Sequence, residues 1–149
     1  MNIGFVMYNW ESVEPKLDTT LRLINECLLR GHKVTAIYPN EMAIRRTEVW
    51  ANTYVISSNN LETENFIEFY RSCTLKEEFV KMCEHDVVFF RDNPPLDNHL
   101  LNFMDTLEND VFFINSISRS LSPVGSKKPL KEQVLVSKFI PIRTILLSV

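Results

Sequence analysis

Residues 17–38 have the sequence LDTTLRLINECLLRGHKVTAIY, in which a helical pattern is followed by a strand-like run. Apolar residues recur in the first part at the spacing of a buried helix face, and they are Leu17, Leu21, Ile24 and Leu28. Asp18 and Thr19 stand where a helix cap belongs, and Gly31 stands where helices often end in the left-handed conformation. Lys33 to Tyr38 then predicts a strand.

The chain on either side of this stretch extends the pattern. The apolar run Ile3 to Met7 predicts a first buried strand, so that strand, helix and strand form a βαβ unit with parallel strands and a right-handed crossover. Residues 41–57 are rich in β-branched and aromatic side chains and predict a β-excursion such as a hairpin. Residues 64–73 have a helical aromatic stripe that we expect in the core, and we expect the helix to continue over 75–83 with Leu75, Phe79 and Met82 on one side.

The second half begins with Asp86-Val87-Val88-Phe89-Phe90, the most convincing buried strand of the chain. Residues 97–109 predict a helix whose inward side chains are Leu100, Leu101, Met104 and Leu107. Val111 to Ile114 predicts another strand, and Lys128 to Lys138 another helix. The alternation predicts an α/β, Rossmann-like domain over 1–126, with a mostly parallel sheet flanked by helices, and a linker helix and strand over 127–149.

Composition excludes several classes of function. The net charge of −3 and the pI near 5.6 provide no basic face for nucleic acid and no polybasic membrane anchor. No stretch is apolar enough to span a bilayer, and the first residues lack a signal peptide's basic region. Cys27, Cys73 and Cys83 are odd in number and widely spaced, which predicts reduced thiols in a cytoplasmic protein.

The chain also lacks the motifs of a complete catalytic set. Its three glycines, Gly4, Gly31 and Gly125, are too far apart for a dinucleotide or phosphate-binding loop. Its three histidines have no metal-ligand spacing, and no nucleophile elbow is present. We therefore predict no catalytic, cofactor-binding or metal-binding residues within this chain.

Arg91 is the strongest candidate for a binding residue. It follows the buried strand at its carboxyl end, where open α/β sheets bind ligands. A guanidinium there can hold a carboxylate through two parallel hydrogen bonds, and Pro94 and Pro95 would restrict the loop that carries it. The alternative is that Arg91 only pairs with Asp92, Asp97 or another surface acid.

Weaker candidates lie near two other predicted strand ends. Asp18 and Thr19 follow the first loop and are substrate-binding candidates, although a helix cap has the same composition. Asn115 and Ser116 follow the strand Val111 to Ile114 and are candidates on the same grounds, with loop capping as the alternative.

The order of several segments along the chain matches that of a known protein family. The segments GFVM, LDTTLRLINECLLRGHKV, IYPNEMAIR and, most specifically, VVFFRDNPPLD resemble the N-terminal, pre-ATP-grasp domain of prokaryotic-type glutathione synthetases. KFIPIRTILLSV resembles the entry strand of the ATP-grasp domain that follows in that family. The chain departs from the family at Tyr8-Asn9, where an aspartate-proline is usual, and at Asn93, where an aspartate is usual.

The resemblance implies an ATP-dependent carboxylate–amine ligase. In that family γ-glutamylcysteine is phosphorylated to an acylphosphate, which glycine then attacks, and ATP and magnesium are bound in the ATP-grasp domain, which we expect to be missing here. The resemblance implies that this domain helps to bind the peptide through Arg91, contributes to a homo-oligomer and is inactive alone. Two alternatives are a stand-alone binding or regulatory module and the front domain of another ATP-grasp amino-acid ligase.

Overall fold

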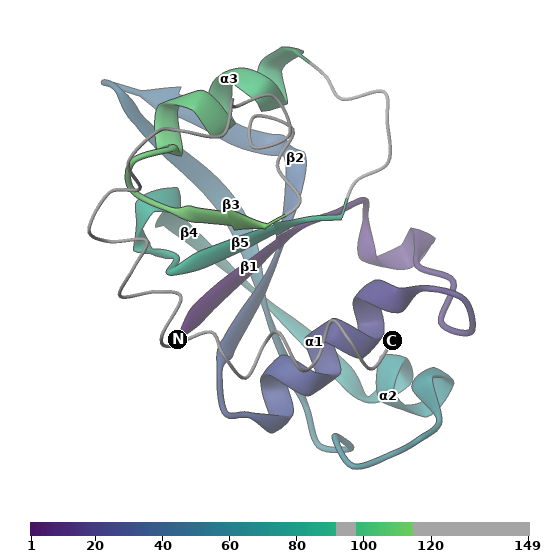
Figure 1. Ribbon diagram of the computed structural model, residues 1–149. Helices are drawn as coiled ribbons and strands as arrows, with labels where there is room; N and C mark the ends of the chain where they lie inside the picture. Colours follow the sequence, from purple (N-terminus) through teal and green to yellow (C-terminus); the bar gives the residue numbers. More distant parts are fainter. Residues whose placement is uncertain (92–97, 115–149) are drawn as a thin grey trace, which may run out of the picture. The chain divides into compact units, whose positions relative to one another are not determined.

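A mixed sheet of six strands organises the part of the chain that the structure describes, residues 1–91 and 98–114 of a computed structural model (Figure 1). The strands are β1 (Asn2–Val6), β2 (Lys33–Arg45), β3 (Glu48–Ser58), β4 (Cys73–Lys81), β5 (Val87–Phe90) and β6 (Phe112–Ile114). The helices are α1 (Thr19–Leu29), α2 (Phe66–Ser72) and α3 (Asn98–Leu107), with short 3-10 turns at Trp10–Ser12 and Met82–Glu84. The order across the sheet is β4-β3-β2-β1-β5-β6.

The half of the sheet that contains β1 is parallel. β1 pairs with β2 on one side and with β5 on the other, and β5 pairs with β6, all in parallel. The βαβ unit predicted around residues 17–38 is therefore confirmed, as is the α/β class with its mostly parallel sheet. Because the chain passes from β1 to β2 on one side and places β5 on the other, the strand order reverses between β1 and β5.

Helix α1 begins and ends as its sequence predicts. The Asp18 carboxylate accepts a 2.6 Å hydrogen bond from the Thr20 amide, which makes Asp18 the N-cap. Gly31 has a φ of +73°, and the amides of Gly31 and His32 donate to the carbonyls of Leu28 and Cys27 in a Schellman ending. Leu17 departs from the predicted helical stripe, because it precedes the cap and is 80% exposed.

The half that contains β3 is antiparallel. β2 and β3 form the predicted hairpin, and Arg46 and Thr47 at its tip both have positive φ, as a type I′ turn requires. The helix predicted over 75–83 is wrong, because this segment forms strand β4 and pairs with β3 along its whole length. Leu75 and Phe79 lie four residues apart, a spacing that places side chains on one side of a helix or of a strand, and cross-strand pairing decides between them.

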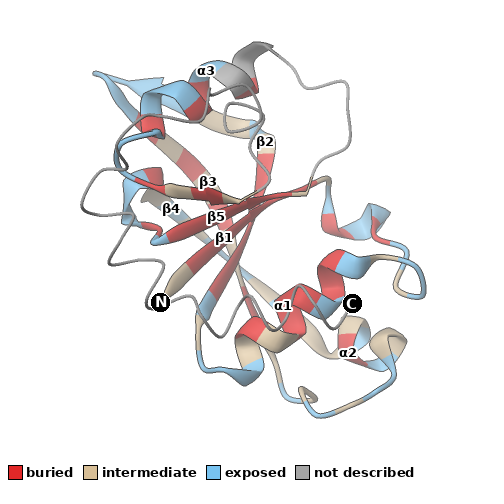
Figure 2. Cartoon of the chain, in the orientation of Figure 1, coloured by how far each residue is buried: buried red, intermediate tan, exposed pale blue. Residues whose placement is uncertain are grey.

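The core lies on both faces of the sheet (Figure 2). Phe5 and Phe89 stack at 4.8 Å on the face covered by α1, and both are at most 1% exposed. Val6, Val88 and Phe90 alternate to the opposite face and form one cluster with Leu100, Phe103, Met104 and Leu107 of α3. This confirms the inward positions predicted for Leu100, Met104 and Leu107. The side chain of Leu101 is not among those that the structure describes.

Several predictions fall outside the described residues. The loop with Pro94 and Pro95, the candidates Asn115 and Ser116, and the helix and strand predicted over 127–149 all belong to this part of the chain. Among the described helices, none is long and apolar enough to cross a membrane. The described cysteines are free thiols, with Cys27 buried and Cys83 exposed.

Candidate functional site

The candidate site lies where the strand order reverses, at the carboxyl ends of β1 and β5. Open α/β sheets form a crevice at this point because the connections from the two adjacent strands leave toward opposite sides. Tyr8 follows β1 and Arg91 follows β5 directly. The Arg91 amide donates a 2.8 Å hydrogen bond to the Val6 carbonyl, which ties the two strand ends together. Arg91 therefore leaves the sheet from a fixed backbone position.

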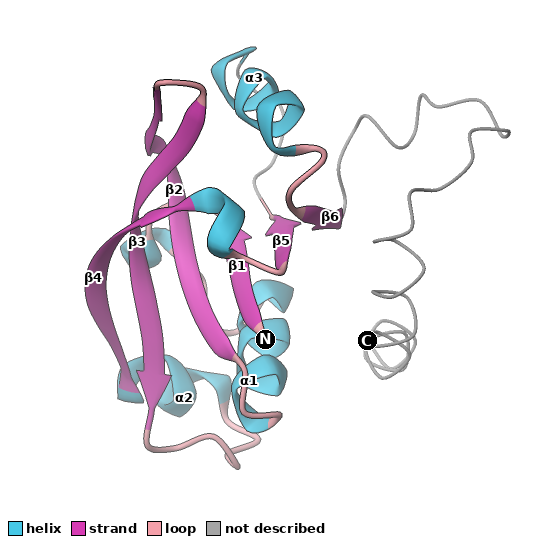
Figure 3. Ribbon diagram, turned by 90° about the vertical axis from the view of Figure 1, so that its left-hand side faces the viewer, coloured by secondary structure: helices cyan, strands magenta, loops and turns pink. Residues whose placement is uncertain are grey.

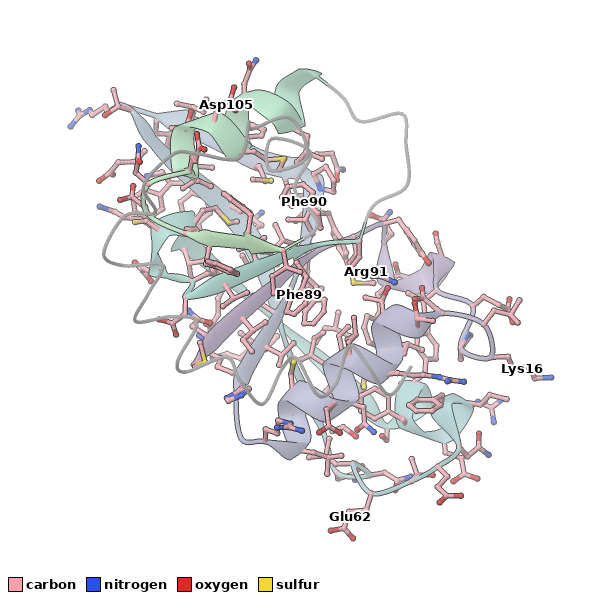
Figure 4. All side chains as sticks on the ribbon, viewed as in Figure 1. Lys16, Glu62, Phe89, Phe90, Arg91 and Asp105 are labelled. Atoms are coloured by element: carbon pink, nitrogen blue, oxygen red, sulfur yellow. The ribbon has the colours of Figure 1, made fainter. Side chains whose placement is uncertain are left out.

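The side chain of Arg91 extends toward the first turn of α1 (Figure 4). Its Nη2 donates a 2.6 Å hydrogen bond to the Thr19 hydroxyl, and its Nε donates a 3.2 Å bond to the Thr20 hydroxyl. Within residues 1–91 and 98–114, no carboxylate forms an ion pair with Arg91. These two neutral hydroxyls use only part of the guanidinium's five donors. The alternative partners Asp92 and Asp97 lie outside the described residues.

Asp18 connects the start of α1 to the end of β1. One of its carboxylate oxygens caps the helix through the Thr20 amide, and the other accepts a short hydrogen bond from the Tyr8 hydroxyl. The capping role that was the alternative for Asp18 is therefore present. Asp18 also lies beside Arg91 in the same hollow, so the two roles do not exclude each other.

A surface hollow of about 370 Å³ collects these residues. It is lined by Tyr8, Glu14, Leu17, Asp18, Thr19, Thr20, Phe90 and Arg91. Its charged side chains are the guanidinium of Arg91 and the two carboxylates of Glu14 and Asp18. A hollow with this charge pattern suits a zwitterion, which carries a carboxylate and an ammonium on one small molecule. A second hollow, near Lys16 and Phe66, lies away from the strand ends.

An aromatic cluster holds the loop that forms one wall of the hollow. The backbone of Trp10 donates to the Tyr38 hydroxyl at 3.1 Å and accepts from the Tyr70 hydroxyl at 3.0 Å. The rings of Trp10 and Tyr70 stack at 5.2 Å, and Trp10 is 6% exposed. Burial raises the pKa of Tyr38, and desolvation likewise raises that of Tyr70, so both hydroxyls remain neutral donors or acceptors at pH 7. The loop between β1 and α1 is thus anchored to β2 and α2.

The structure brings together three of the predicted site residues, Arg91, Asp18 and Thr19. Sequence reasoning missed Tyr8, Glu14 and the anchoring role of Trp10. Tyr8 carries a usable signal, since it follows a buried strand at the ligand-binding edge just as Arg91 does. Glu14 lies in a polar loop and carries no comparable signal.

The fold and the position of the site define an α/β domain with a candidate binding hollow at the carboxyl ends of β1 and β5. A family model described as the prokaryotic glutathione synthetase N-terminal domain matches residues 1–119, and the chain belongs to this family. The resemblance stated from sequence is therefore confirmed. A glutathione synthetase of Buchnera aphidicola is 24% identical to the chain over 101 residues. The matched segment is 68% of this chain and 30% of that relative, so the chain spans about a third of the relative's length.

Proposed function

We propose that this domain binds γ-glutamylcysteine for an ATP-dependent ligase of the glutathione synthetase type. The observation that carries the proposal is the position of Arg91. It stands at the strand reversal, it is oriented by two threonine hydroxyls, and it has no ion-pair partner among the described residues. A substrate carboxylate would complete the hydrogen bonding of its guanidinium.

The acidic side chains of the hollow suggest how the peptide is oriented. γ-Glutamylcysteine carries an α-ammonium next to one of its carboxylates. With that carboxylate on Arg91, Glu14 is the carboxylate best able to accept from the ammonium, because both oxygens of Asp18 already accept hydrogen bonds. The domain would therefore recognise the amino-acid end of the peptide and leave its other end for the reaction.

The described residues do not fit Mg-ATP. Among them, no group of three or more His, Cys, Asp or Glu side chains is placed to hold a metal ion, and the described glycines form no phosphate-binding loop. The binding of ATP and magnesium by an ATP-grasp domain is what the family resemblance implies. What ATP supplies in such ligases is activation of the acid by phosphorylation, and the residues of this chain would bind and orient that acid.

Two other functions share these features. A stand-alone binding or regulatory module would bind the same peptide or glutathione without turnover. The missing glycine loop and the altered positions Tyr8 and Asn93 favour it. The front domain of another amino-acid ligase would bind a different zwitterion in the same hollow.

Calorimetry on this chain separates these possibilities. We expect γ-glutamylcysteine to bind and Mg-ATP not to bind tightly. We expect Arg91→Ala to lower the affinity for the peptide. Equal or tighter binding of an unrelated dipeptide would favour another ligase. Tighter binding of glutathione than of γ-glutamylcysteine would favour a regulatory module.

A further inference from the structure

Tyr8, Asp18 and Arg91 lie in the hollow as parts of one hydrogen-bonded network. Asp18 caps α1, the helix that covers the face of the sheet opposite α3 (Figure 3). One oxygen of Asp18 accepts from the Thr20 amide, and the other accepts from the Tyr8 hydroxyl. Arg91 reaches the same first turn from the end of β5, where its Nε donates to the Thr20 hydroxyl at 3.2 Å. The carboxylate and the guanidinium therefore bind the same residue, one at its amide and the other at its hydroxyl.

Asp18 and Arg91 nevertheless form no ion pair with each other. Both residues are half-buried and both line the hollow, so an ion pair would neutralise the cation that the lining residues provide. Opposite charges that share a neighbouring residue attract each other unless hydrogen bonds hold them in other directions. The donors that hold the Asp18 carboxylate are the Thr20 amide and the Tyr8 hydroxyl. Of these two, the hydroxyl is the one supplied from outside α1.

We propose that Tyr8 is a positioning residue that keeps the carboxylate of Asp18 away from Arg91. Its hydroxyl binds the oxygen of Asp18 that does not cap the helix, so both oxygens are held by donors other than the guanidinium. Arg91 is oriented instead by the hydroxyls of Thr19 and Thr20 and can bind a carboxylate of the ligand. The aspartate that is usual at position 8 in the family could not act in this way, because an ionised carboxylate has no proton to donate. The inference rests on the proposed binding of a substrate carboxylate by Arg91.

A double-variant cycle tests this role. Tyr8→Phe removes the hydroxyl and keeps the ring, which frees one oxygen of Asp18 to pair with Arg91 in competition with the ligand. We expect the affinity for reduced γ-glutamylcysteine, measured by calorimetry, to fall by roughly fivefold, the upper end of what a partly exposed ion pair contributes. In the Asp18→Asn background the same change should have no effect, because a neutral amide cannot neutralise Arg91. A direct contact between Tyr8 and the peptide, or general damage to the loop, would lower the affinity in both backgrounds.

Chemical labelling reports on the Arg91 guanidinium without the peptide. Phenylglyoxal modifies guanidinium groups, and mass spectrometry of the digested chain gives the rate at Arg91 alone. Because an ion pair with Asp18 slows the reaction, we expect Tyr8→Phe to lower this rate by a factor similar to the loss of affinity, and to leave it unchanged in the Asp18→Asn background. Tyr54→Phe is the matched control, because it removes a tyrosine hydroxyl that donates to the Glu41 carboxylate at 3.0 Å, on residues that do not line the hollow. It should change neither the affinity nor the rate.

The outcomes separate this inference from the proposed function. Absence of peptide binding to the wild-type chain would contradict the proposed function, and the labelling rates would still decide the role of Tyr8. The same effect of Tyr8→Phe on affinity in both backgrounds, or an unchanged labelling rate at Arg91 in Tyr8→Phe, would overturn the inference. Circular dichroism of every variant establishes that a lower affinity is not a lost fold.

Discussion

The Arg91 guanidinium donates a 2.6 Å hydrogen bond to the Thr19 hydroxyl, across 72 residues of sequence. The bond joins the residue that follows β5 to the first turn of α1, the helix of the βαβ unit formed by β1, α1 and β2. It orients the cation over the hollow without neutralising it. Affinity for a carboxylate should therefore depend on Thr19 as well as on Arg91.

Thr19→Val removes the hydroxyl and keeps the shape of the side chain. The Arg91 guanidinium then loses one of its two orienting bonds, and we expect peptide affinity to fall by roughly threefold to tenfold, the equivalent of one ordinary hydrogen bond. Urea denaturation should show little change, because Thr19 is exposed. An unchanged affinity would mean that Thr19 does not help to orient Arg91.

Asp18 has a structural role that can be separated from its charge. Asp18→Ala removes the cap of α1 and should lower the free energy of unfolding by about 1 kcal/mol. Asp18→Asn retains an oxygen that can cap the helix, so its stability should stay near that of the wild type. If the two variants were equally unstable in urea, the loss would come from the charge or the Tyr8 contact and not from the cap.

The anchor of the loop can be weakened without touching the hollow. Tyr70→Phe removes the hydroxyl that donates to the Trp10 carbonyl and keeps the ring stack. We expect a loss of roughly 0.5–1.5 kcal/mol in unfolding free energy. Hydrogen exchange should also become faster in the loop between β1 and α1 and remain unchanged in β5. Uniform acceleration throughout the domain would contradict a local anchoring role.

His85 makes stability depend on pH. It is 2% exposed, its Nε2 lies 2.8 Å from the Thr35 hydroxyl, and burial lowers its pKa from the usual value of 6.5. The unfolded chain then binds a proton that the folded chain does not, so stability is full above pH 6.5 and falls as pH decreases below it. The carboxyl groups of Glu48 and Glu78 have lowered pKa values, so the stabilisation that they contribute is lost only at more acidic pH. The change in unfolding free energy just below pH 6.5 is therefore assigned to the histidines.

His85→Gln checks this assignment. The variant removes the titrating group and keeps a polar side chain, so the drop in unfolding free energy between pH 7.5 and 5.5 should become smaller. His32, whose pKa is also lowered, retains its own contribution in the variant. Parallel pH profiles for wild type and variant in urea denaturation would show that His85 does not cause the drop.

The sequence predicted those elements of the domain whose conformation depends on residues close together in the chain. Val87 to Phe90 is an unbroken apolar run, which marks a strand buried on both faces, and Arg91 is placed by that strand alone. The cap at Asp18 and the ending at Gly31 also depend on residues close in sequence. These features fixed the βαβ unit and the edge of the sheet that holds the site.

The parts that sequence did not predict depend on distant contacts. β4 is a strand because β3 pairs with it, and its apolar residues have a spacing that helices share. Glu14 joins the hollow because Trp10, held by Tyr38 and Tyr70, fixes the path of the loop. No local pattern encodes contacts that span 28 and 60 residues.

The most direct test of the account is isothermal titration of this chain with reduced γ-glutamylcysteine, comparing wild type with Arg91→Ala. The central claim is that Arg91 holds a substrate carboxylate. Loss of a charge-assisted hydrogen bond should weaken binding by about 10- to 100-fold, and Arg91→Lys should recover only part of it. Arg71→Ala, which removes an exposed arginine of α2, should bind like the wild type. Absence of binding to the wild type, or equal affinity in Arg91→Ala, would contradict the claim.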